Sequence, residues 1–288
     1  MSTFLKIIRI KIIRTIAAIS NLPVTSISGE YASRANLLSV NAPPQMADNN
    51  NNKIQFIVYA FILSYPFLIM KILSINVSEP KKIVFNGKEL ITSIYKKPIN
   101  GSVDVSDIGI SGDRQADMKV HGGYDKAVYA YSYKHYKKWS DEMGQEYSEY
   151  GLVGENLTID DFDEKSVKIG DEFEVGSCIL QVSQPRIPCF KIGIKMNSRE
   201  FPKKFSTSGL LGSYLRVIQN GSIQSGDELK LIKTEENSLS LFDIASILFK
   251  DINNIEKMKA ALDLKYLTEE IKERFRERLM KLGDFDSL

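Results

Sequence analysis

The chain has 288 residues, of which 43% are hydrophobic and 26% charged, as expected for a globular protein with one sizeable core and an accessory domain. Its formal net charge of +2 gives no reason to expect a nucleic acid as partner. With only two cysteines and two histidines, a disulfide framework, a four-ligand zinc site and a His-built metal site are excluded. A bound soft metal would therefore depend on a single thiolate.

Residues 1–69 differ in character from the rest of the chain. Residues 1–29 carry four cationic side chains and no acid, which suits a transit peptide or a basic membrane-facing helix. Residues 54–70 are almost wholly apolar, and a stretch of about 17 residues is close to the minimum that spans a bilayer. We consider two interpretations of this region. A genuine targeting or anchoring extension predicts an organellar or membrane-anchored protein. A true start at Met70, with an artefact of the gene model upstream, predicts a cytoplasmic one.

Residues 70–235 are predicted to form a β-rich domain, with a first strand directly after Met70. Residues 83–85 and 88–94 flank Asn86-Gly87, a pair that tolerates the positive φ angles of a type I′ turn, so we expect a hairpin. Alternating apolar residues predict further strands, which lie around residues 103–105, 173–175, 178–182, 214–218 and 229–232.

One helix is expected to interrupt this β pattern. Tyr136, Trp139 and Met143 recur at helical spacing and would share one face. Ser132 is predicted to cap the start of this helix, and Gly144 is predicted to end it.

Residues 236–288 are predicted to form a three-helix module, because the apolar spacing becomes helical there. Ser240 and Thr268 are the predicted caps of its first and last helices, and a middle helix is expected over residues 254–262. We interpret this module as a packing element without chemistry of its own.

Cys189 lies in a segment, residues 183–191, that two prolines should stiffen. Each proline fixes φ, removes a backbone donor and pushes the preceding residue into extended geometry, so the segment cannot pair fully inside a sheet. Arg186 and Lys191 flank Cys189, and nearby positive charge favours the thiolate, which is the reactive and metal-binding form. We therefore interpret Cys189 as functional, whereas Cys178 fits a buried core position.

A second cluster contains a glycine pair beside a histidine. Gly122 and Gly123 let the backbone approach a ligand closely and could present N–H groups to an anion. His121 could donate a hydrogen bond or a proton. A solvated turn explains the same residues, so this cluster is not specific by itself.

Two more clusters could contact a ligand. Asn156 and Thr158 have side chains suited to the edge of a heteroaromatic ring, although a helix cap or an Asx-turn explains them equally well. Arg216 follows the hydroxyl- and glycine-rich residues 206–213, and together they could hold a phosphate.

Taken together and in this order, the clusters resemble those of the MOSC domain family (molybdenum cofactor sulfurase C-terminal domain), and within it the YiiM-type proteins. The matching stretches are residues 112–123, 154–158, 184–191 and 212–227. The resemblance covers about residues 70–285 and does not cover residues 1–69. Four ordered motifs make it far more specific than any one of them.

The resemblance implies a mainly β, MOSC-type barrel with peripheral helices, followed by the small helical module, that binds the molybdenum pterin cofactor. In such proteins the cysteine of the Pro-Cys motif ligates molybdenum, and this position is Cys189 here. The resemblance also implies an oxidoreductase that reduces N-hydroxylated compounds, such as hydroxylamino-purines and hydroxylamines, to amines. A separate flavoprotein reductase would supply the electrons, and the oligomeric state is left open, with a homodimer as one option.

The resemblance further implies roles for individual residues. The reaction itself needs a nearby proton source, for which we suggest His121 or Asp117. The residues expected to bind the cofactor are Arg186, Lys191, Arg216, Asn156, Thr158, Gly122 and Gly123.

Three alternatives compete with this interpretation. The chain could carry the molybdenum cofactor, or sulfur as a persulfide on Cys189, without redox turnover of its own. It could also be a thiol hydrolase in which His121 or His135 assists Cys189. Pyridoxal phosphate is sometimes associated with MOSC domains, but no lysine stands out as a Schiff-base partner, so we do not expect that cofactor.

Overall fold

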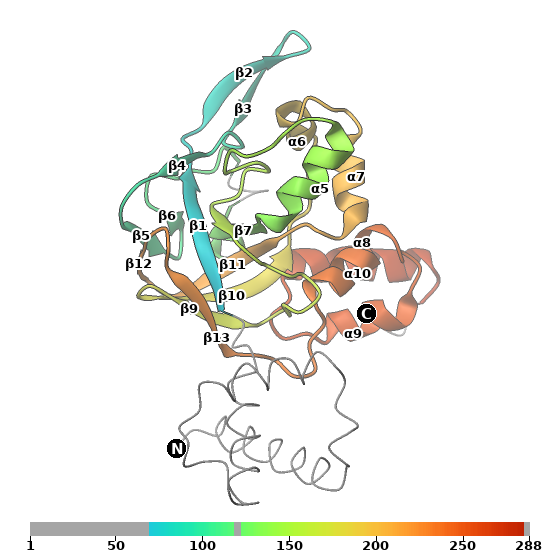
Figure 1. Ribbon diagram of the computed structural model, residues 1–288. Coiled ribbons are helices and arrows are strands. Elements are labelled where there is room, and N and C mark those ends of the chain that lie inside the picture. Colours follow the sequence, from blue (N-terminus) through green and yellow to red (C-terminus); the bar gives the residue numbers. More distant parts are fainter. Residues whose placement is uncertain (1–68, 118–121, 285–288) are drawn as a thin grey trace, which may run out of the picture. The chain divides into compact units, whose positions relative to one another are not determined.

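A barrel of seven strands forms the centre of the computed structural model, which describes residues 69–117 and 122–284 (Figure 1). The strand order is β13-β9-β10-β11-β7-β8-β1, and pairing of β13 with β1 closes the ring. Only the β7–β8 pair is parallel within this described ring. The strands are β1 (Ile69–Val77), β7 (Val128–Ser132), β8 (Leu157–Ile159), β9 (Glu172–Val175), β10 (Cys178–Pro185), β11 (Ser213–Gln219) and β13 (Glu228–Lys233). The predicted mainly β fold with a barrel is confirmed.

The barrel encloses an apolar core, and closure leaves none of these seven strands as an open edge. Cys178, Leu180 and Val182 lie on one face of β10, and all three are fully buried. Burial raises the pKa of Cys178 to about 11, so this thiol stays protonated at neutral pH. The prediction that Cys178 belongs to the core is confirmed.

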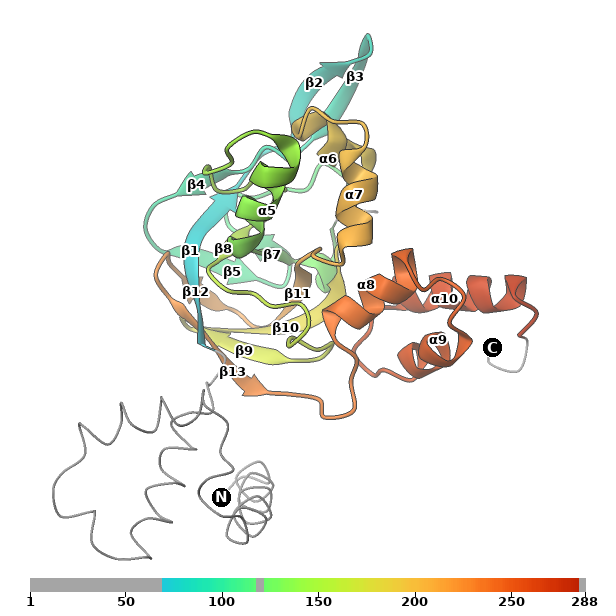
Figure 2. The same ribbon diagram turned by 45° about the vertical axis from the view of Figure 1, so that its right-hand side comes forward.

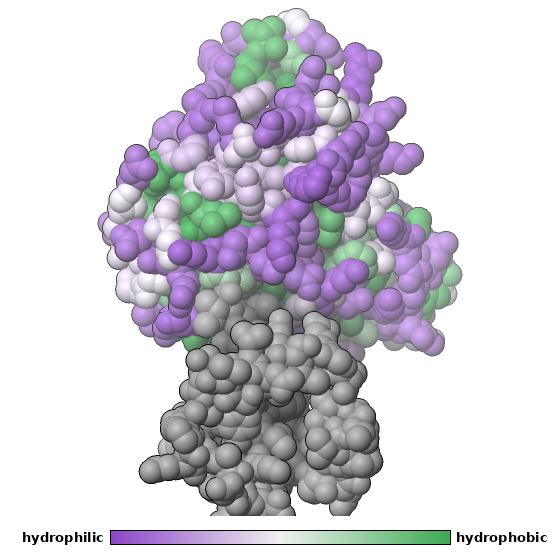
Figure 3. All heavy atoms as spheres, in the orientation of Figure 1, coloured by the Kyte–Doolittle hydropathy of each residue, from purple (hydrophilic) through white to green (hydrophobic). Residues whose placement is uncertain are grey.

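A hairpin of β2 (Lys81–Phe85) and β3 (Lys88–Thr92) projects from the barrel (Figure 1). Its turn residues Asn86 and Gly87 have φ angles of 52° and 74°, as the predicted type I′ turn requires. Figure 3 shows hydrophobic side chains near the end of this hairpin, where Val84 is 75% exposed. The remaining short strands are β4 (Lys97–Ile99), β5 (Val103–Ser106), β6 (Gly109–Ile110) and β12 (Gly221–Ile223), of which the last three form a separate sheet.

Helix α5 (Lys134–Met143) buries Tyr136 and Trp139, as their spacing predicted, and ends at Gly144 with a φ of 63°. The prediction that Ser132 caps this helix is wrong. Ser132 is the last residue of β7, and its hydroxyl accepts a hydrogen bond of 3.1 Å from the N–H of Phe162. The Ser132 hydroxyl therefore accepts a hydrogen bond from Phe162 instead of from the first turn of α5, and the helix begins without a side-chain cap. Two shorter helices, α6 (Phe190–Lys195) and α7 (Phe201–Ser208), follow β10.

Three helices follow the last barrel strand, and Figure 2 shows them together at one side of the barrel. Ser240, Asn254 and Thr268 each accept a hydrogen bond from a backbone N–H of the first turn, which confirms the predicted caps at Ser240 and Thr268. Their buried apolar side chains join the same core cluster as those of the barrel. The division of the chain at residue 235 stays a prediction. The helices are α8 (Leu241–Phe249), α9 (Ile255–Leu262) and α10 (Glu269–Lys281).

The predicted targeting or anchoring segment lies outside the described residues, apart from Ile69, where β1 begins. Within residues 69–117 and 122–284, no helix combines the length and the apolar character needed to cross a bilayer.

Candidate functional site

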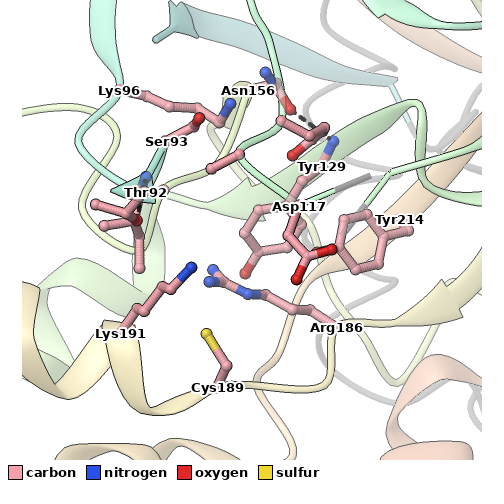
Figure 4. Close-up of a pocket in the computed structure, with 14 residues that line it drawn as sticks. Thr92, Ser93, Lys96, Asp117, Tyr129, Asn156, Arg186, Cys189, Lys191 and Tyr214 are labelled. Carbon is pink, nitrogen blue, oxygen red and sulfur yellow. Dashed lines mark hydrogen bonds between the residues drawn. The ribbon is translucent and has the colours of Figure 1, made fainter. Parts of the chain in front are cut away.

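A pocket that opens to solvent brings together segments that are far apart in the sequence, and the space between its walls, open solvent included, is about 510 Å³. One wall comes from Thr92 at the end of β3 and from residues 93–96, which connect β3 to β4. Another comes from residues 186–189, which connect β10 to α6, and from Lys191 in the first turn of α6. Tyr129 of β7 and Tyr214 of β11 lie between these walls (Figure 4). Pairing of β10, β11 and β7 in the barrel explains why these segments meet.

Cys189 directs its sulfur into this pocket (Figure 4). It is a free, half-buried thiol with extended backbone angles (φ −110°, ψ 170°) immediately before α6. Strand β10 continues to Pro185, and the following residues leave the sheet, as the two prolines predicted. The chain therefore presents the thiol from a stiff segment at the end of a central barrel strand.

Two cations lie beside this thiol, and both were predicted from the sequence (Figure 4). Arg186 is only 5% exposed, donates a hydrogen bond from one guanidinium nitrogen to the carbonyl of Val153, and stacks 4.7 Å from the centre of the Tyr129 ring. Lys191 donates a hydrogen bond of 2.9 Å to the carbonyl of Ile91. This arrangement favours a thiolate or another anion in the pocket.

One donor of the Arg186 guanidinium has no hydrogen-bond partner in the part of the chain that the structure describes. Among the described residues, Nε of Arg186 is one of three buried side-chain polar atoms that make no hydrogen bond. A second is the hydroxyl of Ser93, which lines the same pocket. A buried polar group without a partner costs folding free energy of about 1–3 kcal/mol, so native structures keep such groups mainly for a purpose. Two of them in one pocket indicate a polar or anionic ligand.

Lys96 forms a buried ion pair behind Ser93. Its ammonium contacts Asp113, and both side chains are at most 5% exposed. Burial lowers the pKa of Lys96, and the neighbouring Asp113 opposes this shift. The other oxygen of Asp113 accepts a hydrogen bond of 2.9 Å from the amide of Asn156, which in turn accepts one of 3.1 Å from the N–H of Tyr129. Asn156 thus lines the pocket, while its amide joins strands of the barrel, and its predicted role in binding the cofactor stays a prediction.

Thr158 lies behind the pocket rather than in its lining. Its hydroxyl donates a hydrogen bond of 2.9 Å to Glu155, which is fully buried. The same carboxylate accepts hydrogen bonds from the N–H groups of Gly151 and Val153 at 3.1 and 3.0 Å, and from the hydroxyl of Tyr136. Glu155 therefore holds the turn whose Val153 carbonyl binds Arg186.

Arg216 also lies outside the pocket lining. It is 8% exposed, and its guanidinium donates hydrogen bonds to Asp125, to the side chain of Gln181 at 3.1 Å and to the carbonyl of Tyr266 at 2.9 Å. Through these hydrogen bonds Arg216 joins β11 to β10 and to the C-terminal helices. A role for Arg216 in binding the cofactor stays a prediction.

The remaining predicted residues are divided between pocket and surroundings. Asp117 lines the pocket. Gly122 and Gly123 do not line it, although Gly123 has a φ of 90° and precedes the short 3-10 helix η3 (Tyr124–Lys126). His121 lies outside the described residues. His135 lies on α5 and contacts Glu164 at 2.8 Å, outside the pocket lining.

Ser93, Lys96, Tyr129 and Tyr214 were not predicted from the sequence, although all four line the pocket. Tyr214 lies inside the matching stretch 212–227 but was not singled out as a pocket residue. The closed barrel brings these residues to the cysteine. Within the described part of the chain, no group of three or more His, Cys, Asp and Glu side chains could hold a metal ion. The donor set therefore fits a cofactor that brings most of its own metal ligands and adds one protein thiolate.

The geometry defines a class: a β-barrel protein with a thiol and a cationic pocket at the end of one strand. The model of the MOSC domain matches residues 117–230. The chain is 33% identical to the uncharacterised protein YflK of Bacillus subtilis (strain 168) over 211 residues, which are 73% of this chain and 95% of YflK. A protein named "Reductase" from Gibberella moniliformis (strain M3125 / FGSC 7600) is 33% identical over 165 residues, which are 56% of this chain but 29% of that protein. The crystal structure of YiiM from Geobacillus stearothermophilus is 32% identical, with a TM-score of 0.62 over 73% of this chain and 99% of that one. The chain belongs to the MOSC domain family.

Proposed function

We propose that this chain is a molybdenum-cofactor-dependent oxidoreductase that reduces N-hydroxylated compounds to amines. The observation that carries the proposal is that one cationic pocket contains both the Cys189 thiol and the Nε of Arg186, which has no hydrogen-bond partner in the described part of the chain. Membership of the MOSC family supports an association with the molybdenum cofactor. The relative named a reductase supports an oxidoreductase role.

In this proposal Cys189 binds molybdenum as a thiolate, and Arg186 and Lys191 stabilise the negative charge around it. The bound cofactor supplies the two-electron reduction of an N–O bond, with electrons from an external flavoprotein reductase. The buried rings of Tyr129 and Tyr214 exclude water from the floor of the pocket. Burial raises the pKa of Tyr214, so its hydroxyl remains neutral there.

The overall reaction consumes two electrons and two protons for each hydroxylamine and yields an amine and water. Asp117 lines the pocket and is our proposed proton donor on the protein side, with His121 as the other predicted donor. Asn156 positions Tyr129 and Asp113 through its amide, so it supports the pocket from behind.

The test is metal and pterin analysis of the full chain from a host that makes the cofactor, followed by assays with hydroxylamines and a chemical reductant. Cys189→Ala should lose molybdenum, whereas Cys178→Ala, which removes the buried thiol of the core, should retain it. Wild-type protein without molybdenum or pterin contradicts the proposal. Equal contents in wild type and Cys189→Ala would show that Cys189 is not an essential ligand.

A second candidate is a carrier of the cofactor or of sulfur. The half-buried, pocket-facing thiol of Cys189 favours this candidate too, since it could hold a persulfide. A carrier would contain the cofactor or a Cys189 persulfide and show no turnover with any hydroxylamine. Mass spectrometry of the intact protein and the reductase assay together distinguish the two.

A further inference from the structure

Two polar side chains lie at the end of the pocket that is remote from Cys189. Ser93 and Lys96 come from the segment between β3 and β4. Figure 4 shows them across the cavity from the sulfur of Cys189, which lies close to the charged groups of Arg186 and Lys191. The pocket therefore has two polar ends, and the cysteine occupies only one of them.

The hydroxyl of Ser93 makes no hydrogen bond with any residue in ranges 69–117 and 122–284. Ser93 is 8% exposed, and its oxygen is one of the buried polar atoms without a hydrogen bond among the residues that the structure describes. A hydroxyl can donate one hydrogen bond and accept two, so burying it without any partner destabilises the fold unless a ligand contacts it. An unpartnered buried hydroxyl that lines a cavity thus points to a ligand group at that place.

Lys96 adds positive charge beside this hydroxyl. Its ion pair with Asp113 uses one of the three N–H donors of the ammonium. Asp113 is itself held by the N–H of Ser78 at 2.8 Å and by the amide of Asn156 at 2.9 Å. Because the carboxylate is fixed by these protein donors, it orients Lys96 and leaves the other ammonium donors for a ligand.

We propose that Ser93 and Lys96 form a subsite for the oxyanion of a phosphate ester. A hydroxyl and an ammonium are both donors to phosphate oxygens, and lysine binds phosphate as a compact point charge. Asp113 already pairs with Lys96, so the excess positive charge of the lining comes from Arg186 and Lys191, which outnumber Asp117 and favour an anionic ligand electrostatically. A ligand that reaches both ends is anchored by its phosphate at one end and contacts Cys189 at the other.

The inference rests on the proposed function only for the source of the phosphate, which is carried either by the cofactor or by a nucleotide substrate. The subsite itself is tested on cofactor-free protein with inorganic phosphate. Thermal unfolding is followed in increasing phosphate, with chloride at matched ionic strength as reference. Wild-type protein should be stabilised more by phosphate than by chloride, because only the folded state contains the subsite.

Ser93→Ala should weaken phosphate binding by about tenfold or more, since a hydrogen bond to a charged acceptor is lost. Ser93→Thr keeps the hydroxyl and should retain binding. The matched control is Ser238→Ala, which also removes a buried hydroxyl without a partner but lies outside the pocket lining, and it should bind phosphate as wild type does. The same phosphate response in Ser93→Ala and wild type, or no specific response in wild type, overturns the proposal.

The source follows from a second measurement on the same variants. Loss of molybdenum and pterin in Ser93→Ala, produced in a cofactor-competent host, assigns the phosphate to the cofactor. Full cofactor content with a raised KM for an N-hydroxylated nucleotide, but not for its free base, assigns it to the substrate. If wild-type protein shows the Ser93-dependent phosphate response but never contains molybdenum, the subsite stands and the reductase proposal fails.

Discussion

Replacing Arg186 with methionine should separate ligand binding from folding. The guanidinium is 5% exposed, has one hydrogen bond to the carbonyl of Val153, and keeps Nε without a partner among the described residues. A methionine has a similar stem but no charge, so it tests what the cation contributes. We expect the variant to fold and to lose most of its affinity for the anionic ligand of the pocket.

The magnitude follows from opposing contributions. Loss of the donor leaves the Val153 carbonyl unpaired, which costs about 1–3 kcal/mol. Loss of the stacking on Tyr129, at 4.7 Å, costs about 2 kcal/mol for a desolvated pair. Removal of a buried cation regains a desolvation free energy of several kcal/mol. These terms nearly cancel, so the unfolding free energy of the ligand-free protein should change by less than about 2 kcal/mol.

The affinity of Arg186→Met for the ligand falls without any opposing gain of this kind. A hydrogen bond to a charged ligand contributes about 1.5–3 kcal/mol, which corresponds to a loss of about 10- to 100-fold in affinity. The assay is urea unfolding of protein with and without cofactor, and the difference between the two unfolding free energies measures the stabilisation by the ligand. In Arg186→Met this difference should shrink, while the ligand-free value stays close to wild type.

Arg216→Met is the matched control, because Arg216 is buried to a similar degree at 8% exposure. All of its contacts are with the protein, namely Asp125, Gln181 and the carbonyl of Tyr266. This variant should lower the unfolding free energy by about 2–4 kcal/mol. An unchanged stabilisation by ligand would place Arg216 outside the cofactor-binding residues, and a reduced one would support the role predicted from the sequence. The opposite pattern, with Arg186→Met losing more than about 4 kcal/mol of ligand-free stability and keeping the ligand effect, would refute the reasoning.

Three further predictions concern the surroundings of the pocket. Gly154→Ala should lower the unfolding free energy by about 2–4 kcal/mol, because φ is +85° and the new Cβ would lie 2.8 Å from the buried side chain of Ile94. Gly87→Ala is the control, since φ is +74° but no atom lies within 4 Å, and its unfolding free energy should fall by only about 1 kcal/mol. Iodoacetamide at pH 8 should modify the pocket-facing Cys189 in the folded protein but not Cys178, because burial raises the pKa of Cys178 to about 11. Mass spectrometry that finds both cysteines labelled equally fast would contradict this assignment. Burial lowers the pKa of Lys195 from 10.5 to about 8, so above pH 8 the folded state releases this proton before the unfolded state does. The unfolding free energy of wild type should therefore rise by up to about 3 kcal/mol between about pH 8 and 10.5, and Lys195→Met should lack this rise. Urea unfolding that gives wild type and Lys195→Met the same dependence of unfolding free energy on pH would contradict this prediction.

Features that depend on neighbouring residues in the chain were predictable from the sequence. Asn86-Gly87 form the hairpin turn, Gly144 ends α5 in a left-handed conformation, and Thr268 caps α10, because each of these effects acts over a few residues. The segment around Cys189 belongs to the same group, since its prolines and flanking cations are adjacent in sequence. The cysteine and two cations of the site could therefore be identified before the fold was known.

The rest of the site depends on strand pairing, which a single sequence does not reveal. Ser93 and Lys96 follow the projecting hairpin, and Tyr214 comes from β11, so they meet Cys189 only after the barrel closes. Tertiary partners also redirect side chains whose local chemistry suggested other roles. The hydroxyl of Ser132 contacts Phe162 rather than capping a helix.

The C-terminal helices illustrate how far such tertiary support extends. The hydroxyl of Thr268 donates a hydrogen bond of 2.7 Å to the side chain of Gln184, which directly precedes the proline where β10 ends. Two residues earlier, the carbonyl of Tyr266 accepts a hydrogen bond of 2.9 Å from Arg216 of β11. These bonds tie the start of α10 to β10, which leads into the segment with Cys189, and to β11, which contains Tyr214. The pocket lining contains no described residue after Tyr214, yet this connection fixes where β10 leaves the sheet and hence where the thiol is presented.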